Sequence, residues 1–110
     1  IILDARNKKR FHGIINEPRQ GLRKGHIPKS KNLFWGNLIS KQGKILPKNK
    51  IIKKLNHYKL NNKSIITSCG SGVTACILSL ALLHSQNIQS RVYDGSWNEW
   101  GLNKKLPIEK

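Results

Sequence analysis

The sequence contains no methionine, only two cysteines and only five acidic residues among 110. Because translation starts at methionine, its absence predicts a fragment or a processed chain, with sequence missing before Ile1. The longest apolar run, residues 75–83, is interrupted only by Ser79. It is too short to provide the ~20 residues that cross a bilayer, so no membrane-spanning helix is expected.

The shortage of acidic residues leaves a formal net charge of +16. Such a charge can indicate nucleic-acid binding. The basic residues, however, are scattered as pairs such as Lys8-Lys9 and Lys53-Lys54, with no dense block and no interleaved aromatic residues. We therefore expect no nucleic-acid partner. The charge is interpreted as a lysine-rich surface whose field would help to attract a small anionic substrate.

The two cysteines, Cys69 and Cys76, are spaced neither as a CxxC redox pair nor as ligands of a four-ligand zinc site. The histidines also lack the spacing of metal ligands. No metal and no cofactor are expected. Free thiols suit a reducing compartment better than an oxidising one, which predicts a cytoplasmic location.

Strand-like and helix-like segments alternate along the chain. Strands are expected at residues 1–3, 64–68 and 91–93. A helix capped by Asn49 is expected to bury an apolar stripe made of Ile51, Ile52, Leu55 and Tyr58. A second helix is expected to bury Val73, Cys76, Ile77, Leu80 and Ala81. Residues 6–32 are expected to form a long irregular loop with a functional role. This alternation predicts an α/β fold with a mostly parallel sheet flanked by helices, in one domain spanning residues 1–110.

The most informative segment places Cys69 where a strand ends, before a glycine-containing loop that leads into a helix. Inward-pointing backbone N–H groups and the helix N-terminus would stabilise a thiolate there and lower the pKa of Cys69. The same groups could hold a persulfide or an anionic substrate. An inert buried cysteine at a tight turn explains this segment equally well. Cys76 is expected to be a small buried apolar residue of the following helix.

Residues 69–75 resemble the active-site loop of the 3-mercaptopyruvate sulfurtransferases, which belong to the rhodanese superfamily. The loop reads Cys69-Gly70-Ser71-Gly72-Val73-Thr74-Ala75. Four further segments resemble family landmarks in the expected order: residues 3–6, 25–28, 32–33 and 93–101. Lys29 departs from the pattern, because a small residue usually follows residues 25–28. The resemblance covers essentially the whole chain. It implies a rhodanese-like domain, the C-terminal catalytic half of a two-domain enzyme.

The resemblance also implies a reaction. Cys69 would take a sulfane sulfur from 3-mercaptopyruvate as a persulfide and pass it to a thiol, thioredoxin or cyanide. Ser71 would relay a proton or polarise the substrate, with its aspartate and histidine partners in the missing N-terminal rhodanese-like domain. Arg10 and Arg19 match the two substrate arginines, whose planar guanidinium groups suit a carboxylate. The loop residues that would bind the sulfur anion or substrate are Gly70, Gly72, Val73 and Thr74.

Three alternatives remain. The first is a thiosulfate sulfurtransferase, although enzymes specific for thiosulfate carry bulky basic residues where this chain has Gly70 and Ser71. The second is a regulatory rhodanese-like binding module, which often lacks the cysteine. The third, a phosphatase or arsenate reductase of the same fold, needs an arginine in the loop, and residues 70–74 contain none.

Other polar residues are expected to be structural. Asp4 and Arg6 are predicted to pair with each other and so to shape the first loop. His26 is predicted to be a packing and hydrogen-bonding residue of its turn. Trp97 and Trp100 are expected in the core or at its rim, and Trp97 could line the mouth of the pocket.

Overall fold

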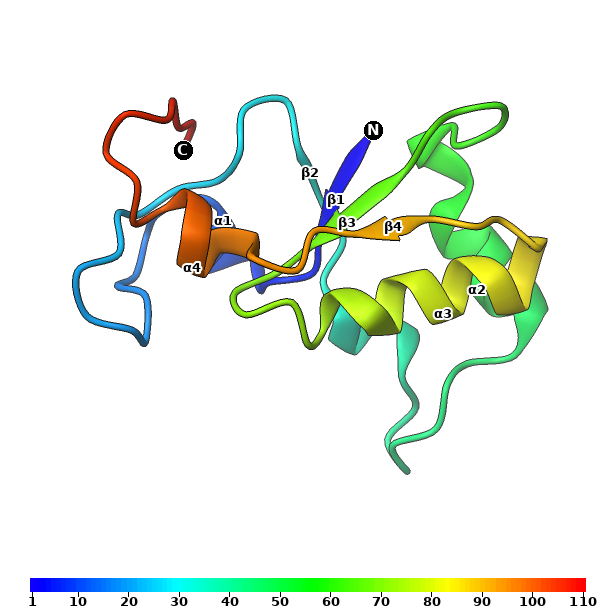
Figure 1. The fold of residues 1–110 in the computed structure, drawn as a ribbon. Coiled ribbons are helices and arrows are strands. Elements are labelled where there is room, and N and C mark those ends of the chain that lie inside the picture. The colour runs from blue at the N-terminus through cyan, green and yellow to red at the C-terminus, as the bar shows by residue number, and fades with distance from the viewer.

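The computed structural model describes residues 1–110 and contains a four-stranded parallel sheet with the strand order β2-β1-β3-β4 (Figure 1). The strands are β1 (Ile2–Asp4), β2 (Lys31–Asn32), β3 (Ile66–Ser68) and β4 (Arg91–Val92). The helices are α1 (Lys8–Phe11), α2 (Lys48–Leu55), α3 (Ala75–Gln86) and α4 (Ser96–Trp100), with 3-10 turns η1 (Trp35–Leu38) and η2 (Asn56–Tyr58). The predicted α/β fold with a parallel sheet is confirmed. None of the helices combines the length and the apolar character that crossing a membrane requires.

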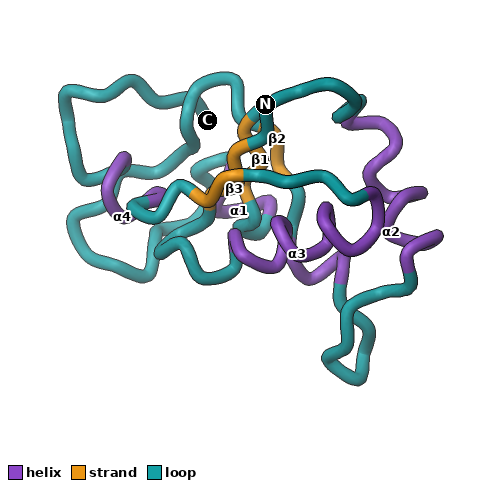
Figure 2. The backbone as a smooth tube through the Cα atoms, turned by 45° about the vertical axis from the view of Figure 1, so that its right-hand side comes forward, coloured by secondary structure: helices purple, strands orange, loops and turns teal.

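The main core lies between the sheet and the packed pair α2 and α3 (Figure 2). Leu3 of β1 and Ile65 beside β3 are buried there against Leu78 and Leu82 of α3. The other two helices lie away from this pair: α1 follows β1, and α4 follows β4. The crevice beyond the carboxyl ends of parallel strands is the usual ligand site of such sheets, and α1 and α4 border it here.

The register of the two central strands brings the first loop and the cysteine loop together. Asp4 is paired with Ser68, and the Ala5 N–H donates to the Ser68 carbonyl at 2.8 Å. The residues that leave β1 and β3 therefore emerge side by side. This places Arg6 and Cys69, which are distant in sequence, at the same edge of the sheet.

The buried face of α3 differs from the prediction. Ala75, Leu78, Ala81 and Leu82 are buried, whereas Val73 is 71% exposed, Leu80 is 55% exposed and Cys76 is exposed. The prediction of Cys76 as a buried residue was therefore wrong. Because α3 is apolar on nearly every side, periodicity does not distinguish its faces, and contact with α2 and the sheet selects the buried one.

Two local predictions were also wrong. Helix α2 begins at Lys48 after Pro47, so Asn49 lies inside the helix and does not cap it. Within the predicted stripe Ile52 is exposed, and Tyr58 lies in η2, where its hydroxyl donates to the Asn32 carbonyl at 2.6 Å.

The predicted irregular loop contains two short elements. Residues 6–32 include α1, whose N-cap Asn7 accepts a hydrogen bond from the Arg10 N–H, and the strand β2. A helix of a single turn leaves too short an apolar pattern to be recognised from sequence.

The expected structural contacts of Asp4, Arg6 and His26 are confirmed. Arg6 Nη2 lies 2.7 Å from the Asp4 carboxylate, and both groups are buried. The His26 ring stacks on Phe11 at 3.7 Å between centroids, and its Nδ1 lies 2.7 Å from the Phe11 carbonyl. These contacts attach the loop of residues 6–32 to the end of β1 at Asp4 and join its two halves at Phe11 and His26.

The corrected face of α3 predicts a difference between two leucines of the same helix. Leu78→Ala should lower the free energy of unfolding by about 2–5 kcal/mol, because Leu78 is fully buried in the core. Leu80→Ala should change it by about 0.5 kcal/mol or less, because that side chain is mostly in solvent. Urea denaturation of both variants measures the difference. Equal losses would contradict the assignment of the buried face.

Candidate active site

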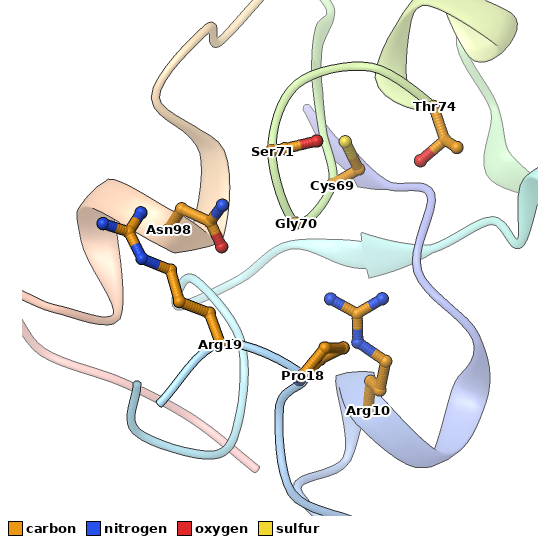
Figure 3. Close-up of a pocket in the computed structure, with 8 residues that line it drawn as sticks. All are labelled: Arg10, Pro18, Arg19, Cys69, Gly70, Ser71, Thr74 and Asn98. Carbon is orange, nitrogen blue, oxygen red and sulfur yellow. The ribbon is translucent and has the colours of Figure 1, made fainter. Parts of the chain in front are cut away.

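A pocket of about 290 Å³ opens at the carboxyl ends of the strands, with Cys69 in its wall (Figure 3). Its lining comprises Arg10, Pro18, Arg19, Cys69, Gly70, Ser71, Thr74 and Asn98. Six of these residues were predicted as site residues from the sequence, and the structure brings all six together. Pro18 and Asn98 were not predicted. Of the remaining predicted residues, Gly72 is buried within the loop, and the side chain of Val73 faces solvent outside the lining.

The cysteine loop surrounds the sulfur of Cys69 with hydrogen-bond donors. The residue is 1% exposed, and the Gly72 N–H donates to Sγ at 2.9 Å. Burial by itself raises the pKa of Cys69, but hydrogen bonds from the Thr74 hydroxyl and from the backbone N–H groups of Ala75, Gly72 and Ser71 lower it further than burial raises it. The net result is a pKa below that of an ordinary thiol, which favours the nucleophilic thiolate.

The N-terminus of α4 holds this loop in place through the main chain. The Cys69 N–H donates to Ser96 Oγ at 3.0 Å, the Trp97 N–H donates to the Cys69 carbonyl at 2.9 Å, and the Asn98 N–H donates to the Gly70 carbonyl at 2.8 Å. Unpaired N–H groups at the start of a helix are thereby satisfied by the loop. Ser96 was not predicted as a site residue, although it lies within the family landmark of residues 93–101.

Gly72 is required by the close approach of the loop to the chain before α4. Its φ of +96° lies in the left-handed region, and a Cβ at this position would lie 2.6 Å from the Asp94 carbonyl oxygen. Any other residue would displace the N–H group that donates to Cys69.

Arg10 reaches the pocket from α1 and is held by a buried carboxylate. Its Nη2 lies 2.8 Å from Glu17 Oε1, and its Nε lies 3.2 Å from both oxygens of the same carboxylate. The Glu17 side chain is 0% exposed, and Arg6 Nη1 lies 3.2 Å from it on the other side. Glu17 was not predicted. Its only sequence signal was its position next to Pro18 and Arg19 in a chain with few acidic residues.

The opposite wall of the pocket is formed by Arg19 and Asn98, which lie close together in Figure 3. Neither side chain has a protein hydrogen-bond partner or an ion-pair partner. Both groups are therefore available to a ligand. With Arg10, two guanidinium groups border the pocket that contains Cys69, which suits a small anion.

Ser71 and Trp97 complete the account of the predicted residues. The Ser71 hydroxyl lies beside the sulfur in Figure 3 but hydrogen-bonds to no histidine or aspartate of this chain. Trp97 is buried, its indole N–H donates to the Arg23 carbonyl at 2.8 Å, and it does not line the pocket. No group of three histidine, cysteine or acidic side chains is placed to hold a metal ion.

Comparison with known proteins shows the family to which the chain belongs. The family described as "Rhodanese-like domain" matches residues 1–103. A mitochondrial thiosulfate/3-mercaptopyruvate sulfurtransferase of Arabidopsis thaliana is 42% identical over 97% of this chain and 28% of its own length. A 3-mercaptopyruvate sulfurtransferase of Escherichia coli is 40% identical over 98% of this chain and 38% of its own length. The solved structure of the 3-mercaptopyruvate sulfurtransferase from Leishmania major has a TM-score of 0.81 at 31% identity, covering 98% of this chain and 31% of that one. The chain thus spans about a third of the length of these relatives. It belongs to the rhodanese-like domain family.

Proposed function

We propose that the chain is the catalytic domain of a sulfurtransferase that transfers sulfur through Cys69. The observation that carries the proposal is a thiol of lowered pKa in a pocket bordered by two arginines. A nucleophile of this kind beside two cations is suited to a small anionic sulfur donor. The names of the relatives agree with this class of reaction.

The proposed donor is 3-mercaptopyruvate. The Cys69 thiolate attacks the sulfur of the donor, the carbon–sulfur bond breaks, and its electron pair stays on carbon, which takes up a proton to give pyruvate. Cys69 is left as a persulfide. An acceptor thiolate then attacks the outer sulfur, and the Cys69 thiolate leaves. Arg10 and Arg19 would bind the carboxylate and the adjacent carbonyl, and Ser71 would relay the proton.

The backbone N–H groups of the loop would hold the charge of the persulfide as they hold that of the thiolate. The donor already present is the Gly72 N–H, 2.9 Å from Sγ. The N–H groups of Ser71 and Ala75 favour the thiolate in the same way. Among the predicted loop residues, Gly70, Gly72, Val73 and Thr74, the role of Val73 would be limited to its main chain, because its side chain lies in solvent.

The second candidate donor is thiosulfate, whose sulfonate also suits two arginines. The cysteine loop itself carries no cation at Gly70 or Ser71, which favours the carboxylate donor with its larger spacing between sulfur and charge. A regulatory module without activity is a weaker proposal, because such a role does not require the hydrogen bonds that lower the pKa of Cys69.

The coverage of the relatives supports a second part of the proposal. The chain would act within a two-domain enzyme, with an N-terminal rhodanese-like domain that supplies partners to Ser71. Its acceptor would be a thiol such as thioredoxin. The cytoplasmic location stays a prediction, and the Arabidopsis relative is mitochondrial by name.

The persulfide predicts a covalent adduct on one cysteine. Exposure of the protein to 3-mercaptopyruvate should increase its intact mass by about 32 Da, one sulfur atom, and reducing agent should remove the increase. The adduct should be lost in Cys69→Ser and kept in Cys76→Ser, which removes the exposed thiol. An adduct that survives in Cys69→Ser would refute the assignment of the nucleophile.

The donor assignment predicts a difference in steady-state kinetics. For the full-length protein, kcat/KM with 3-mercaptopyruvate should exceed that with thiosulfate by about tenfold or more, equivalent to about 1.4 kcal/mol. The reason is that Gly70 and Ser71 place no cation within the cysteine loop itself, whereas Arg10 and Arg19 border the pocket where a carboxylate would bind. A higher kcat/KM with thiosulfate would reverse the choice of donor.

The lowered pKa predicts how alkylation depends on pH. In a Cys76→Ser background, the rate of Cys69 alkylation by iodoacetamide should rise with pH and level off at a lower pH than for a free thiol, whose pKa is about 8.5. Thr74→Val should move the midpoint to higher pH, because it removes a hydrogen bond to the thiolate while burial remains. Ser71→Ala is the matched control, since Ser71 contributes its backbone N–H group. A midpoint that does not move in Thr74→Val would contradict this account.

A further inference from the structure

Glu17 is a fully buried carboxylate that the proposed reaction does not use. Burying an ionised acidic side chain costs free energy unless a cation pairs with it. The groups that contact Glu17 therefore indicate its role. It accepts three hydrogen bonds from Arg10, one from Nη2 at 2.8 Å and two from Nε at 3.2 Å. Arg6 Nη1 lies 3.2 Å away but is held independently, because Arg6 also binds Asp4 and the Gly25 carbonyl.

The contacts with Arg10 fix the direction of its guanidinium group. Binding through both Nε and Nη2 is bidentate, so the plane of the group cannot rotate freely. The remaining nitrogen, Nη1, has no protein partner. In Figure 3 the guanidinium group extends from α1 toward Gly70 and Cys69.

Gly70 provides the space that this orientation requires. A Cβ at position 70 would lie 2.7 Å from Arg10 Nη2, closer than such atoms approach. Its φ is not in the left-handed region, so the backbone by itself would accept a larger residue. A side chain at position 70 and the observed position of Arg10 therefore exclude each other. The position of Arg10 in α1 thus depends on the residue at position 70 of the cysteine loop, which is distant in sequence.

We propose that Glu17 is a positioning residue, which holds the Arg10 guanidinium beside Cys69, in the space that Gly70 leaves open, and so favours donors with a carboxylate. This assignment rests on the proposed sulfurtransferase function for its substrate but not for its geometry. In this chain the cation comes from α1, and its position depends on Glu17.

The test compares two alkylating reagents of nearly the same size on Cys69. Iodoacetate carries a carboxylate and iodoacetamide does not, so the ratio of their rates measures carboxylate recognition at the thiol. All variants are made in a Cys76→Ser background, so that only Cys69 reacts. The ratio is independent of sulfur transfer. If the protein transfers no sulfur but the ratio behaves as expected, only the proposed function fails.

Glu17→Gln and Gly70→Ala should each lower the iodoacetate-to-iodoacetamide ratio by about tenfold, because the rate with iodoacetate falls more than the rate with iodoacetamide. Arg10→Gln should lower the ratio to the same extent. The double variant Arg10→Gln/Glu17→Gln should lower it no further, since both changes remove one guanidinium from the site. With 3-mercaptopyruvate, KM should rise more than kcat falls. Glu109→Gln removes a half-exposed carboxylate at His26, outside the pocket, and should leave the ratio unchanged.

The opposite outcomes overturn the proposal. If Glu17 acted only through its charge, its removal would make the pocket more positive and raise the ratio. If it acted only on folding, both rates would change together and the ratio would stay constant. Glu17→Asp separates position from charge, because it keeps the charge but shortens the side chain. It should lower the ratio nearly as much as Glu17→Gln. Should Glu17→Gln fail to fold, Glu17→Asp tests the position of the carboxylate and Gly70→Ala tests the space for Arg10, and an unchanged ratio in both would overturn the proposal.

Discussion

The structure depends on a buried chain of alternating charges, Asp4–Arg6–Glu17–Arg10, which runs from the end of β1 to the pocket. Two of the five acidic residues of this strongly basic protein are used in it. Each internal charge faces an opposite one, and a buried ion is stable only under that condition. The chain ties the long loop of residues 6–32 to the sheet, and it ends with a guanidinium group beside Cys69. The Asp4–Arg6 pair that shapes the first loop and the Arg10 side chain that borders the pocket are thus linked through Glu17.

The loop of Cys69 illustrates how main-chain geometry produces reactivity. Burial opposes the thiolate, and the N–H groups of the loop with the Thr74 hydroxyl favour it more strongly. Those groups point at the sulfur because α4 holds the carbonyls of Cys69 and Gly70 from outside, and because Gly72 has a left-handed conformation against Asp94. The chemistry of the thiol therefore depends on residues 94–98, which lie far from it in sequence.

Much of the fold could be predicted from sequence, because its signals are local. Apolar β-branched segments predicted β1 and β3, and the cysteine between a strand and a glycine-containing loop indicated the site. Predictions failed where a local pattern allows several outcomes. Helix α3 is apolar on nearly every side, so the core face was misassigned and Cys76 was placed inside. Glu17, Ser96 and Asn98 were not predicted as site residues, because Glu17 had only its position beside Arg19 as a signal, and the landmark of residues 93–101 does not show which of its side chains reach the site.

The sequence by itself determined the class of fold, and its resemblance to a family indicated Cys69 as the proposed nucleophile together with the two arginines that border the pocket. These follow from periodicity and from an ordered set of motifs, which are properties of contiguous residues. Only the tertiary structure decided which groups surround the sulfur and what holds Arg10. The reason is that burial and hydrogen-bond partners depend on segments brought together by the parallel register of β1 and β3. Whether a charge is stabilised is decided by neighbours in space.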